Sequence, residues 1–155
     1  MKGHDMKQVM LAVAVLMAVF TSATRAEVAW SEDFADASST AAEQGKYMLL
    51  NFTGSDWCGW CIKLDKEVFS QEAYEQFASE NLVSVKLDFP RRKQLSPGVV
   101  AQNDQLQQKY GIRGFPTIII LSPEGDLVQQ TGYRDGGPEA YVEHLQEIIA
   151  QHKGE

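Results

Sequence analysis

The chain has 155 residues, of which 44% are hydrophobic and 23% charged, which is enough for one globular domain with a single core. Its 14 basic and 21 acidic residues give a formal net charge of −7. This balance argues against nucleic-acid binding as the main task, because phosphate contacts require clustered Lys and Arg.

The first 26 residues differ from the rest of the chain. Lys2 and Lys7 precede an apolar run over residues 9–20, and a polar stretch ends at Ala26. This order is typical of a signal peptide, and the run is shorter than the ~20 residues that a membrane-spanning helix needs. We expect residues 1–26 to be removed on export, with an uncleaved membrane anchor as the alternative. The remaining domain, with 11 basic and 20 acidic residues, would then be periplasmic or secreted.

The domain over residues 27–155 begins with a predicted short strand at residues 28–30. Ser31 is a candidate cap for a helix that runs to about residue 44, where Gly45 ends it. Residues 46–52 are mostly apolar and predict a buried strand.

A helix is predicted from residue 58 to about residue 79, after the buried strand. Residues 83–89 alternate between apolar and polar side chains, which predicts a strand with two unlike faces. Residues 90–103 contain two prolines, a glycine and the basic residues 91–93, and we interpret them as a long loop.

The last third of the chain predicts a short helix over residues 105–110 and a buried β-branched strand over residues 117–121. A turn with Pro and Gly leads to a partner strand at residues 127–133, and a final helix opens at Gly137. The predicted order is β-α-β-α-β-α-β-β-α, with a mixed sheet and an antiparallel terminal hairpin.

The only two cysteines, Cys58 and Cys61, lie three positions apart where the buried strand gives way to the helix. A disulfide across so short a loop stabilises a fold by only about 2 kcal/mol, so the pair suits reversible chemistry better than structural support. Cys58 falls at the helix N-terminus, where free N–H groups and the macrodipole favour a negative charge. Its sulfur is therefore a candidate nucleophilic thiolate.

Two motifs, Trp57-Cys58-Gly59-Trp60-Cys61 and residues 110–117, resemble those of the thioredoxin superfamily, and the likeness extends from about residue 30 to residue 151. Residues 51–57 are similar to those of exported bacterial thioredoxin-like and thiol:disulfide interchange proteins. The resemblance implies an α/β thioredoxin-like fold, in which a mixed central sheet is flanked by helices on both faces.

The resemblance also implies roles for individual residues. Cys58 is expected to attack a substrate disulfide and Cys61 to resolve the mixed disulfide. A cis bond is expected before Pro116, and the backbone of Phe115 would pair with extended substrate. Substrate contacts are expected at Trp57, Gly59, Trp60, Phe115 and Pro116. Structural alternatives exist for each: a half-buried aromatic for Trp57, a cap on the core for Trp60, a tight corner for Gly59, and an ordinary proline at 116.

One position departs from the family. Thioredoxins have a buried aspartate before the motif as a proton relay, and the nearest residue here is Asn51, whose amide cannot take a proton. Asp56 is a second candidate relay, with solvation as the alternative. The basic residues 91–93 would either steer an acidic partner or offset local charge. His144 and His152, on the last helix, are interpreted as surface residues.

We therefore expect an exported, monomeric thiol–disulfide oxidoreductase that exchanges disulfides with protein substrates and a redox partner, as a reductase, without a bound cofactor or metal. Stable membrane association is not expected once residues 1–26 are removed. Two alternatives are a non-catalytic binding or chaperone-like module on the same fold, and a carrier of Cu(I) through the two thiolates.

Overall fold

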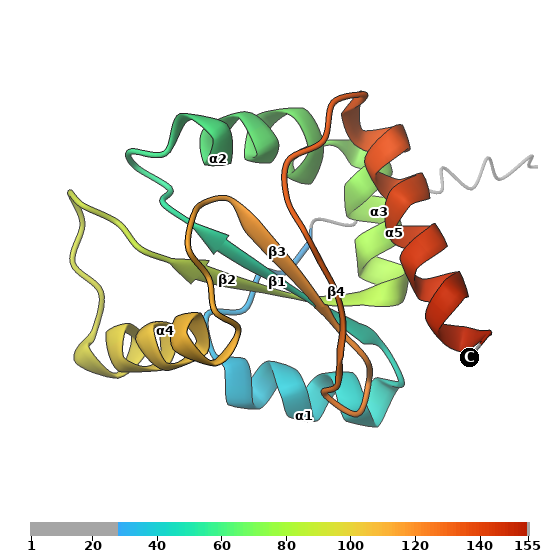
Figure 1. Cartoon of the computed structure of the whole chain (residues 1–155), viewed down its shortest axis with the longest axis horizontal. Helices are drawn as coiled ribbons and strands as arrows, with labels where there is room; N and C mark the ends of the chain where they lie inside the picture. Colours follow the sequence, from blue (N-terminus) through green and yellow to red (C-terminus); the bar gives the residue numbers. More distant parts are fainter. Residues whose placement is uncertain (1–27, 155) are drawn as a thin grey trace, which may run out of the picture.

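Figure 1 shows the computed structural model of the protein, which describes residues 28–154. The predicted signal peptide at residues 1–26 lies outside the described residues. In chain order the elements are α1 (Phe34–Gln44), β1 (Tyr47–Thr53), α2 (Gly59–Leu64), the π-helix η1 (Asp65–Phe69), α3 (Glu72–Asn81), β2 (Leu82–Asp88), α4 (Pro97–Lys109), β3 (Thr117–Leu121), β4 (Leu127–Thr131) and α5 (Gly137–Lys153). Within residues 28–154, no helix has both the length and the apolar character needed to cross a membrane.

The four strands form one mixed sheet in the order β2-β1-β3-β4. β1 runs parallel to β2 and antiparallel to β3, and β3 pairs antiparallel with β4. Every residue of β1 is buried, because the strand has neighbours on both edges and helices over both faces. The predicted mixed sheet and its terminal hairpin are therefore confirmed.

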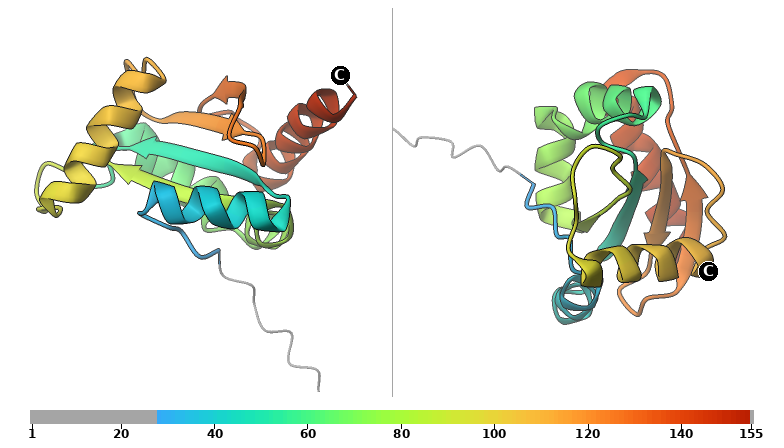
Figure 2. Two further views of the ribbon diagram at one scale, coloured as in Figure 1. Left: turned by 90° about the horizontal axis from the view of Figure 1, so that it is seen from below. Right: turned by 90° about the vertical axis from the view of Figure 1, so that its left-hand side faces the viewer.

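Alternate side chains of the central strands pack into two separate cores. Leu49 and Ile118 contribute to the core under η1, α3 and α5, whereas Leu50 and Ile119 contribute to the core under α1 and α4. Figures 1 and 2 show these two groups of helices on opposite sides of the sheet. The prediction that helices cover both faces is confirmed.

The beginning of the domain differs from the prediction. Residues 28–30 form no strand, and their place is taken by a single parallel bridge between Ser31 and Val85 of β2. The helix is capped by Asp33 rather than by Ser31: the Asp33 carboxylate accepts the Asp36 N–H at 3.0 Å. An ionised acceptor at this position is favoured by the positive end of the helix dipole.

The prediction of one continuous helix over residues 58–79 is wrong, because the segment is divided into α2, η1 and α3. The Ser70 N–H donates to the Asp65 carbonyl, five residues earlier, at 2.8 Å, which is the wider turn of a π-helix. The wider turn lets two consecutive side chains, Val68 and Phe69, enter the core, where they are 1% and 2% exposed. Average periodicity conceals such a local widening.

The loop predicted at residues 90–103 is shorter than expected. α4 begins at Pro97, and the Ser96 hydroxyl oxygen accepts the Val99 N–H at 3.4 Å as its N-cap. Pro97 occupies the first turn of the helix, where a missing N–H costs no hydrogen bond. The loop therefore covers residues 89–96, and the helix predicted at residues 105–110 is the end of α4.

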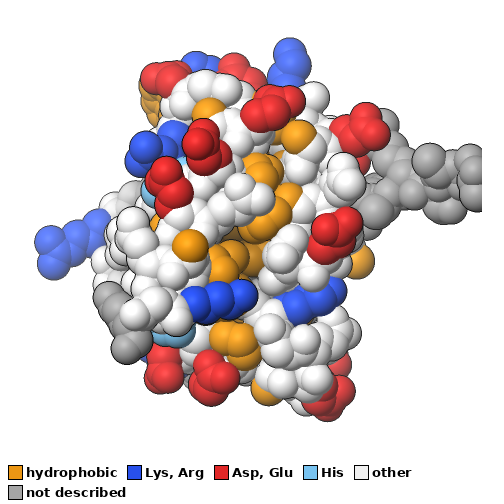
Figure 3. Space-filling view, turned by 90° about the vertical axis from the view of Figure 1, so that its right-hand side faces the viewer, with side chains coloured by type: hydrophobic (Ala, Val, Ile, Leu, Met, Phe, Trp, Pro, Cys, Tyr) orange, Lys and Arg blue, Asp and Glu red, His pale blue; other side chains and the backbone are white. Residues whose placement is uncertain are grey.

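The outward face of α3 and α5 carries dispersed charges. Figure 3 shows carboxylates around a narrow strip of hydrophobic side chains, with lysines and arginines spread out rather than gathered. This face therefore offers no cluster of cations for phosphate contacts. Elsewhere on the described chain, the large hydrophobic side chains that are exposed include Trp60 at 57% and Ile62 at 49%, both on α2.

Candidate functional site

The cysteine pair lies at the carboxyl end of β1, where the chain turns into α2. The Gly54 carbonyl accepts the N–H groups of Trp57 at 3.2 Å and Cys58 at 2.9 Å, which closes a tight turn. Cys58 has an extended backbone and occupies the N-cap of α2, where its Sγ accepts the Cys61 N–H at 3.2 Å. A disulfide joins Cys58 to Cys61, whose Cα atoms are 5.2 Å apart.

The two sulfurs have different surroundings, although both residues are buried, with 7% of Cys58 and 4% of Cys61 exposed. Cys58 Sγ lies at the first turn of the helix, where unpaired N–H groups stabilise a negative charge. Cys61 lies one turn further in and accepts the Gly54 N–H at 3.5 Å. The two sulfurs therefore differ in the backbone N–H that each accepts and in their distance along the chain from the start of α2.

Trp57 fills the space between the cysteine turn and two neighbouring segments. Its Nε1–H donates to the Phe89 carbonyl at 2.8 Å, and its ring meets that of Phe115 edge-on at 6.0 Å. The ring covers Gly54 so closely that a Cβ at that position would lie 2.5 Å from it. Sequence reasoning missed Gly54, because the reason for a glycine there is a contact with a side chain three positions later.

The loop over residues 89–96 is fixed to this turn by Asp56. Its carboxylate accepts the N–H groups of Arg91 at 2.9 Å and Arg92 at 2.7 Å. The hydrogen bond from the Arg91 backbone is the main reason that the pKa of Asp56 lies below its ordinary value. The Arg91 guanidinium also lies 3.8 Å from the centre of the Trp57 ring. Asp56 is thus held as an anion by the loop, which makes it a poor proton acceptor.

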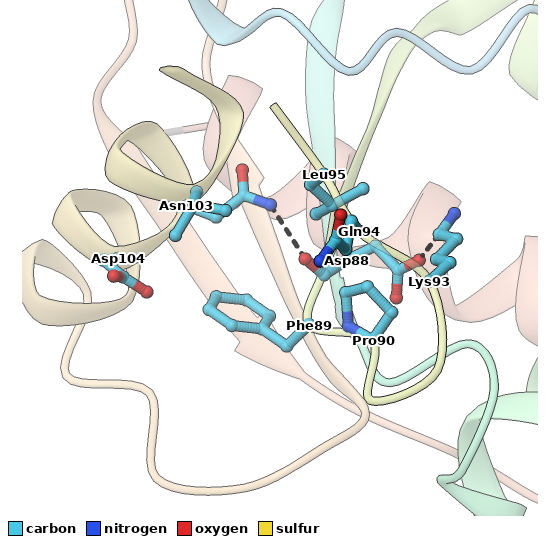
Figure 4. A pocket seen from close by; sticks show the side chains of 9 residues that line it. Asp88, Phe89, Pro90, Lys93, Gln94, Leu95, Asn103 and Asp104 are labelled. Carbon is cyan, nitrogen blue, oxygen red and sulfur yellow. Dashed lines mark hydrogen bonds and ion pairs between the residues drawn. The ribbon is translucent and has the colours of Figure 1, made fainter. Parts of the chain in front are cut away.

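Asp88, at the end of β2, also holds the 89–96 loop in place, through its ion pair with Lys93 (Figure 4). Its carboxylate, on a residue 3% exposed, accepts the Ser55 N–H at 2.9 Å and hydroxyl at 2.6 Å, and pairs with Lys93 Nζ at 3.1 Å. Burial alone would raise the pKa of Asp88, but the hydrogen bonds from Ser55 and Lys93 outweigh it and hold the pKa below its usual value. A hollow of about 400 Å³ between this loop and α4 contains neither cysteine.

The segment before β3 meets the cysteine turn. The Phe115–Pro116 peptide bond is cis, as the resemblance implies. The Phe115 ring contacts Trp57 and also stacks on Phe89, with centroids 5.0 Å apart. The structure therefore brings the two sequence motifs together through the contact between the Trp57 and Phe115 rings.

Trp60 and Gly59 face solvent at the first turn of α2. The Trp60 ring lies 5.1 Å from that of Tyr133, and Lys63 Nζ lies 4.9 Å and 4.8 Å from the two ring centres. Trp60 is thus not a cap on the core. A Cβ at Gly59 would meet no atom within 4 Å. Sequence reasoning placed Tyr133 at the end of the predicted partner strand and missed its contact with Trp60, because β4 ends at Thr131 and Tyr133 lies in the loop after it.

A small cavity lies behind Cys61. Asn51 is 6% exposed, and within the part of the chain that the structure describes its Oδ1 has no hydrogen-bond partner. Lys86 of β2 is opposite Asn51 in the strand register. The cavity of about 160 Å³ is lined by Asn51, Thr53, Ser55, Cys61, Ile62, Asp65 and Lys86. Sequence reasoning missed Asp65 and Lys86, because the strand register and the start of the π-helix decide where they lie.

The two histidines of α5, interpreted from the sequence as surface residues, are partly exposed, and each also makes a hydrogen bond to the sheet. His144 Nε2 lies 3.0 Å from the Thr131 hydroxyl and His152 Nδ1 lies 2.9 Å from the Tyr47 hydroxyl, so both connect α5 to the sheet. Burial lowers the pKa of His144. Among residues 28–154, no group of three or more His, Cys, Asp and Glu side chains is placed to hold a metal ion.

The chain is similar to a known protein family and to characterised proteins. The family model described as thioredoxin-like domain matches residues 34–148. The disulfide bond reductase DsbH of Chlamydia pneumoniae is 32% identical over 124 residues, which cover 80% of this chain and 74% of DsbH. The thiol:disulfide interchange protein DsbD of Actinobacillus pleuropneumoniae is 30% identical over 90 residues, which cover 58% of this chain and only 14% of that protein.

Solved structures agree with these matches. A structure described as DsbH oxidoreductase has a TM-score of 0.77 and 30% sequence identity, and the match covers 81% of this chain and 86% of that one. A thioredoxin from Thermus thermophilus has a TM-score of 0.60 at 15% identity, with coverage of 79% and 88%. The second likeness concerns the fold alone.

Proposed function

Because the chain belongs to the thioredoxin-like domain family, with the Cys58–Cys61 disulfide of a thiol–disulfide oxidoreductase, we propose that it is an exported reductase of protein disulfides. In this proposal Cys58 is the attacking thiolate and Cys61 the resolving thiol. The protein acts as a monomer in the periplasm or outside the cell, and a redox partner returns it to the dithiol form.

The observation that carries the proposal is the position of Cys58. Its Sγ caps the first turn of α2 and accepts the Cys61 N–H at 3.2 Å, so the helix end stabilises a thiolate at the outer sulfur. A thiolate at position 58 attacks one sulfur of a substrate disulfide and forms a mixed disulfide. Cys61 then attacks Cys58, which releases the substrate as a dithiol and leaves the protein oxidised.

Substrate contacts are proposed on both sides of the cysteine pair. Trp57 and Phe115 form one side, and the backbone of Phe115 before cis Pro116 would pair with an extended chain. On the other side, Gly59 has no side chain and leaves open space. The exposed Trp60 ring lies next to it and packs against the Tyr133 ring. Recognition through backbone pairing and broad aromatic surfaces tolerates many sequences, which suits a varied set of protein substrates.

The direction and the place of the reaction rest on the relatives and on the N-terminal sequence. DsbH is described as a disulfide bond reductase, and this chain spans most of its length. The apolar run over residues 9–20 supports export, where protein disulfides persist and become substrates.

Substitution of each cysteine tests the proposed roles. Cys58→Ser should abolish reduction of insulin disulfides, because no attacking thiolate remains. Cys61→Ser should still attack but should accumulate a mixed disulfide, because the resolving thiol is missing. Non-reducing gels and mass spectrometry of the trapped adduct measure both effects. A mixed disulfide that accumulates with Cys58→Ser but not with Cys61→Ser would reverse the two roles. Full insulin reduction by both single variants would contradict them.

A further inference from the structure

The resolving step requires a group that takes the proton of Cys61, and three nearby polar residues cannot do so. Asn51 carries an amide with no basic oxygen or nitrogen. The carboxylate of Asp56 is occupied by the Arg91 and Arg92 N–H groups. That of Asp88 is occupied by Ser55 and Lys93.

The cavity behind Cys61 leads to one further carboxylate. Cys61 and Asp65 both line it, with Cys61 buried at the inner end and Asp65 exposed on η1. Its volume of about 160 Å³ can hold several water molecules, each of which takes about 30 Å³ in the liquid. Asn51 lines this space, and its Oδ1 is a buried acceptor with no partner among residues 28–154, which points to a water bound there.

The other charged group on the cavity is Lys86 of β2. It faces the cavity from the strand, whereas Asp65 faces it from the helix layer. A cation on this cavity stabilises negative charge that develops on the inner sulfur as its proton leaves. Because the one side-chain contact of Asp65 Oδ2 among the described residues is a long one, 3.5 Å from the Ser70 hydroxyl, its carboxylate is free to bind water.

We propose that Asp65 is the proton acceptor for Cys61, acting through water in this cavity and assisted by Lys86; the inference rests on the proposed reductase function. In the resolving step, the Cys61 proton passes to water and on to Asp65. The sulfur electron pair forms the Cys58–Cys61 bond as the bond between Cys58 and substrate breaks. The departing pair stays on the substrate sulfur, which leaves as a thiolate and takes a proton from solvent.

The two thiol steps separate when the reduced protein reacts with one equivalent of the aromatic disulfide DTNB. The first thionitrobenzoate release reports attack by Cys58, and the second reports resolution by Cys61. In Asp65→Asn, the second phase should slow by at least about tenfold at pH 6 and match the unaltered protein above pH 9, where hydroxide removes the proton. The first phase should change by less than about twofold at either pH.

Two further variants make the test specific. Glu72→Gln removes an exposed carboxylate at the start of α3, outside the cavity, and should leave both phases unchanged. Asn51→Asp, added to Asp65→Asn, returns a carboxylate to the same cavity and should restore the second phase at pH 6. Failure of this rescue would overturn the cavity route.

A second phase in Asp65→Asn within twofold of the unaltered protein at pH 6, or slowed equally at pH 6 and pH 9, would overturn the role of Asp65 and leave the reductase proposal intact. Absence of the first phase in the unaltered protein would instead contradict the proposed function, and the inference with it.

Discussion

Gly54 has a steric constraint that Gly59 lacks, although both flank the first cysteine. A Cβ at Gly54 would lie 2.5 Å from the Trp57 ring, whereas a Cβ at Gly59 meets nothing within 4 Å. Trp57 cannot move freely, because its Nε1–H bonds to Phe89 and Arg91 covers its ring. The turn before Cys58 therefore requires glycine at position 54, because a side chain there would overlap the Trp57 ring.

Gly54→Ala should lower the free energy of unfolding by about 1 to 3 kcal/mol, the usual cost of overpacking a close contact. Gly59→Ala, its matched control, should stay within about 1 kcal/mol and favour the folded state, since alanine is the better helix former. Urea unfolding of both variants measures the difference. Equal effects at the two positions would contradict the contact as the cause.

Asp88→Asn should destabilise the protein by about 2 kcal/mol at neutral pH, because hydrogen bonds to a buried carboxylate are lost or weakened. Since the folded pKa of Asp88 lies below the unfolded one, its contribution is complete above the unfolded value near 4 and is lost as pH falls through the folded value. Unfolding free energies of the protein and the variant should therefore converge in acid.

The matched control for this pH dependence is Asp104→Asn, which removes an exposed carboxylate on α4. Its effect should be small at every pH from 2 to 8. A constant gap between Asp88→Asn and the unaltered protein down to pH 2 would show that ionisation of Asp88 does not matter to stability.

At the scale of elements, the strands were the most predictable part of the chain. Residues 46–52 and 117–121 are mostly apolar, and the structure places both in the middle of the sheet as β1 and β3. Helix boundaries were less predictable, because they depend on local hydrogen bonds. The π turn at Asp65 lets both Val68 and Phe69 enter the core, and the average periodicity of the segment does not indicate it.

The same distinction holds for the candidate site. The cysteine pair and Pro116 follow directly from short motifs. The residues around them come from separate parts of the chain: Asp88 ends β2, Asp65 lies on η1, and Tyr133 follows β4. Their positions depend on strand register and on the path of the 89–96 loop, which local sequence does not determine.

The N-cap of α4 gives a prediction at this scale. Ser96→Ala should cost about 1 kcal/mol, because the Val99 N–H loses its acceptor at the start of the helix. Ser39→Ala, at an exposed position within α1, should be neutral or slightly stabilising. Chemical denaturation distinguishes the two. No loss for Ser96→Ala would mean that Pro97 alone sets the start of α4.

At the scale of the whole molecule, the reduction potential of the cysteine pair depends on how stable the fold is with the disulfide compared with the dithiol. The disulfide fits a turn that β1, α2 and the 89–96 loop hold together from three sides. A fold that accommodates the disulfide well resists its reduction by glutathione, so its dithiol is a strong reductant. The proposed reductase direction therefore requires that this turn stabilises the disulfide more than the start of α2 stabilises the Cys58 thiolate.

The midpoint potential of the Cys58–Cys61 pair tests this requirement most directly. The protein is equilibrated with glutathione buffers of known ratio, and the oxidised fraction is measured after acid quenching and thiol labelling. We predict a midpoint of about −270 mV or below, as expected of a reductase. A midpoint around −120 mV would contradict the account and indicate an oxidant.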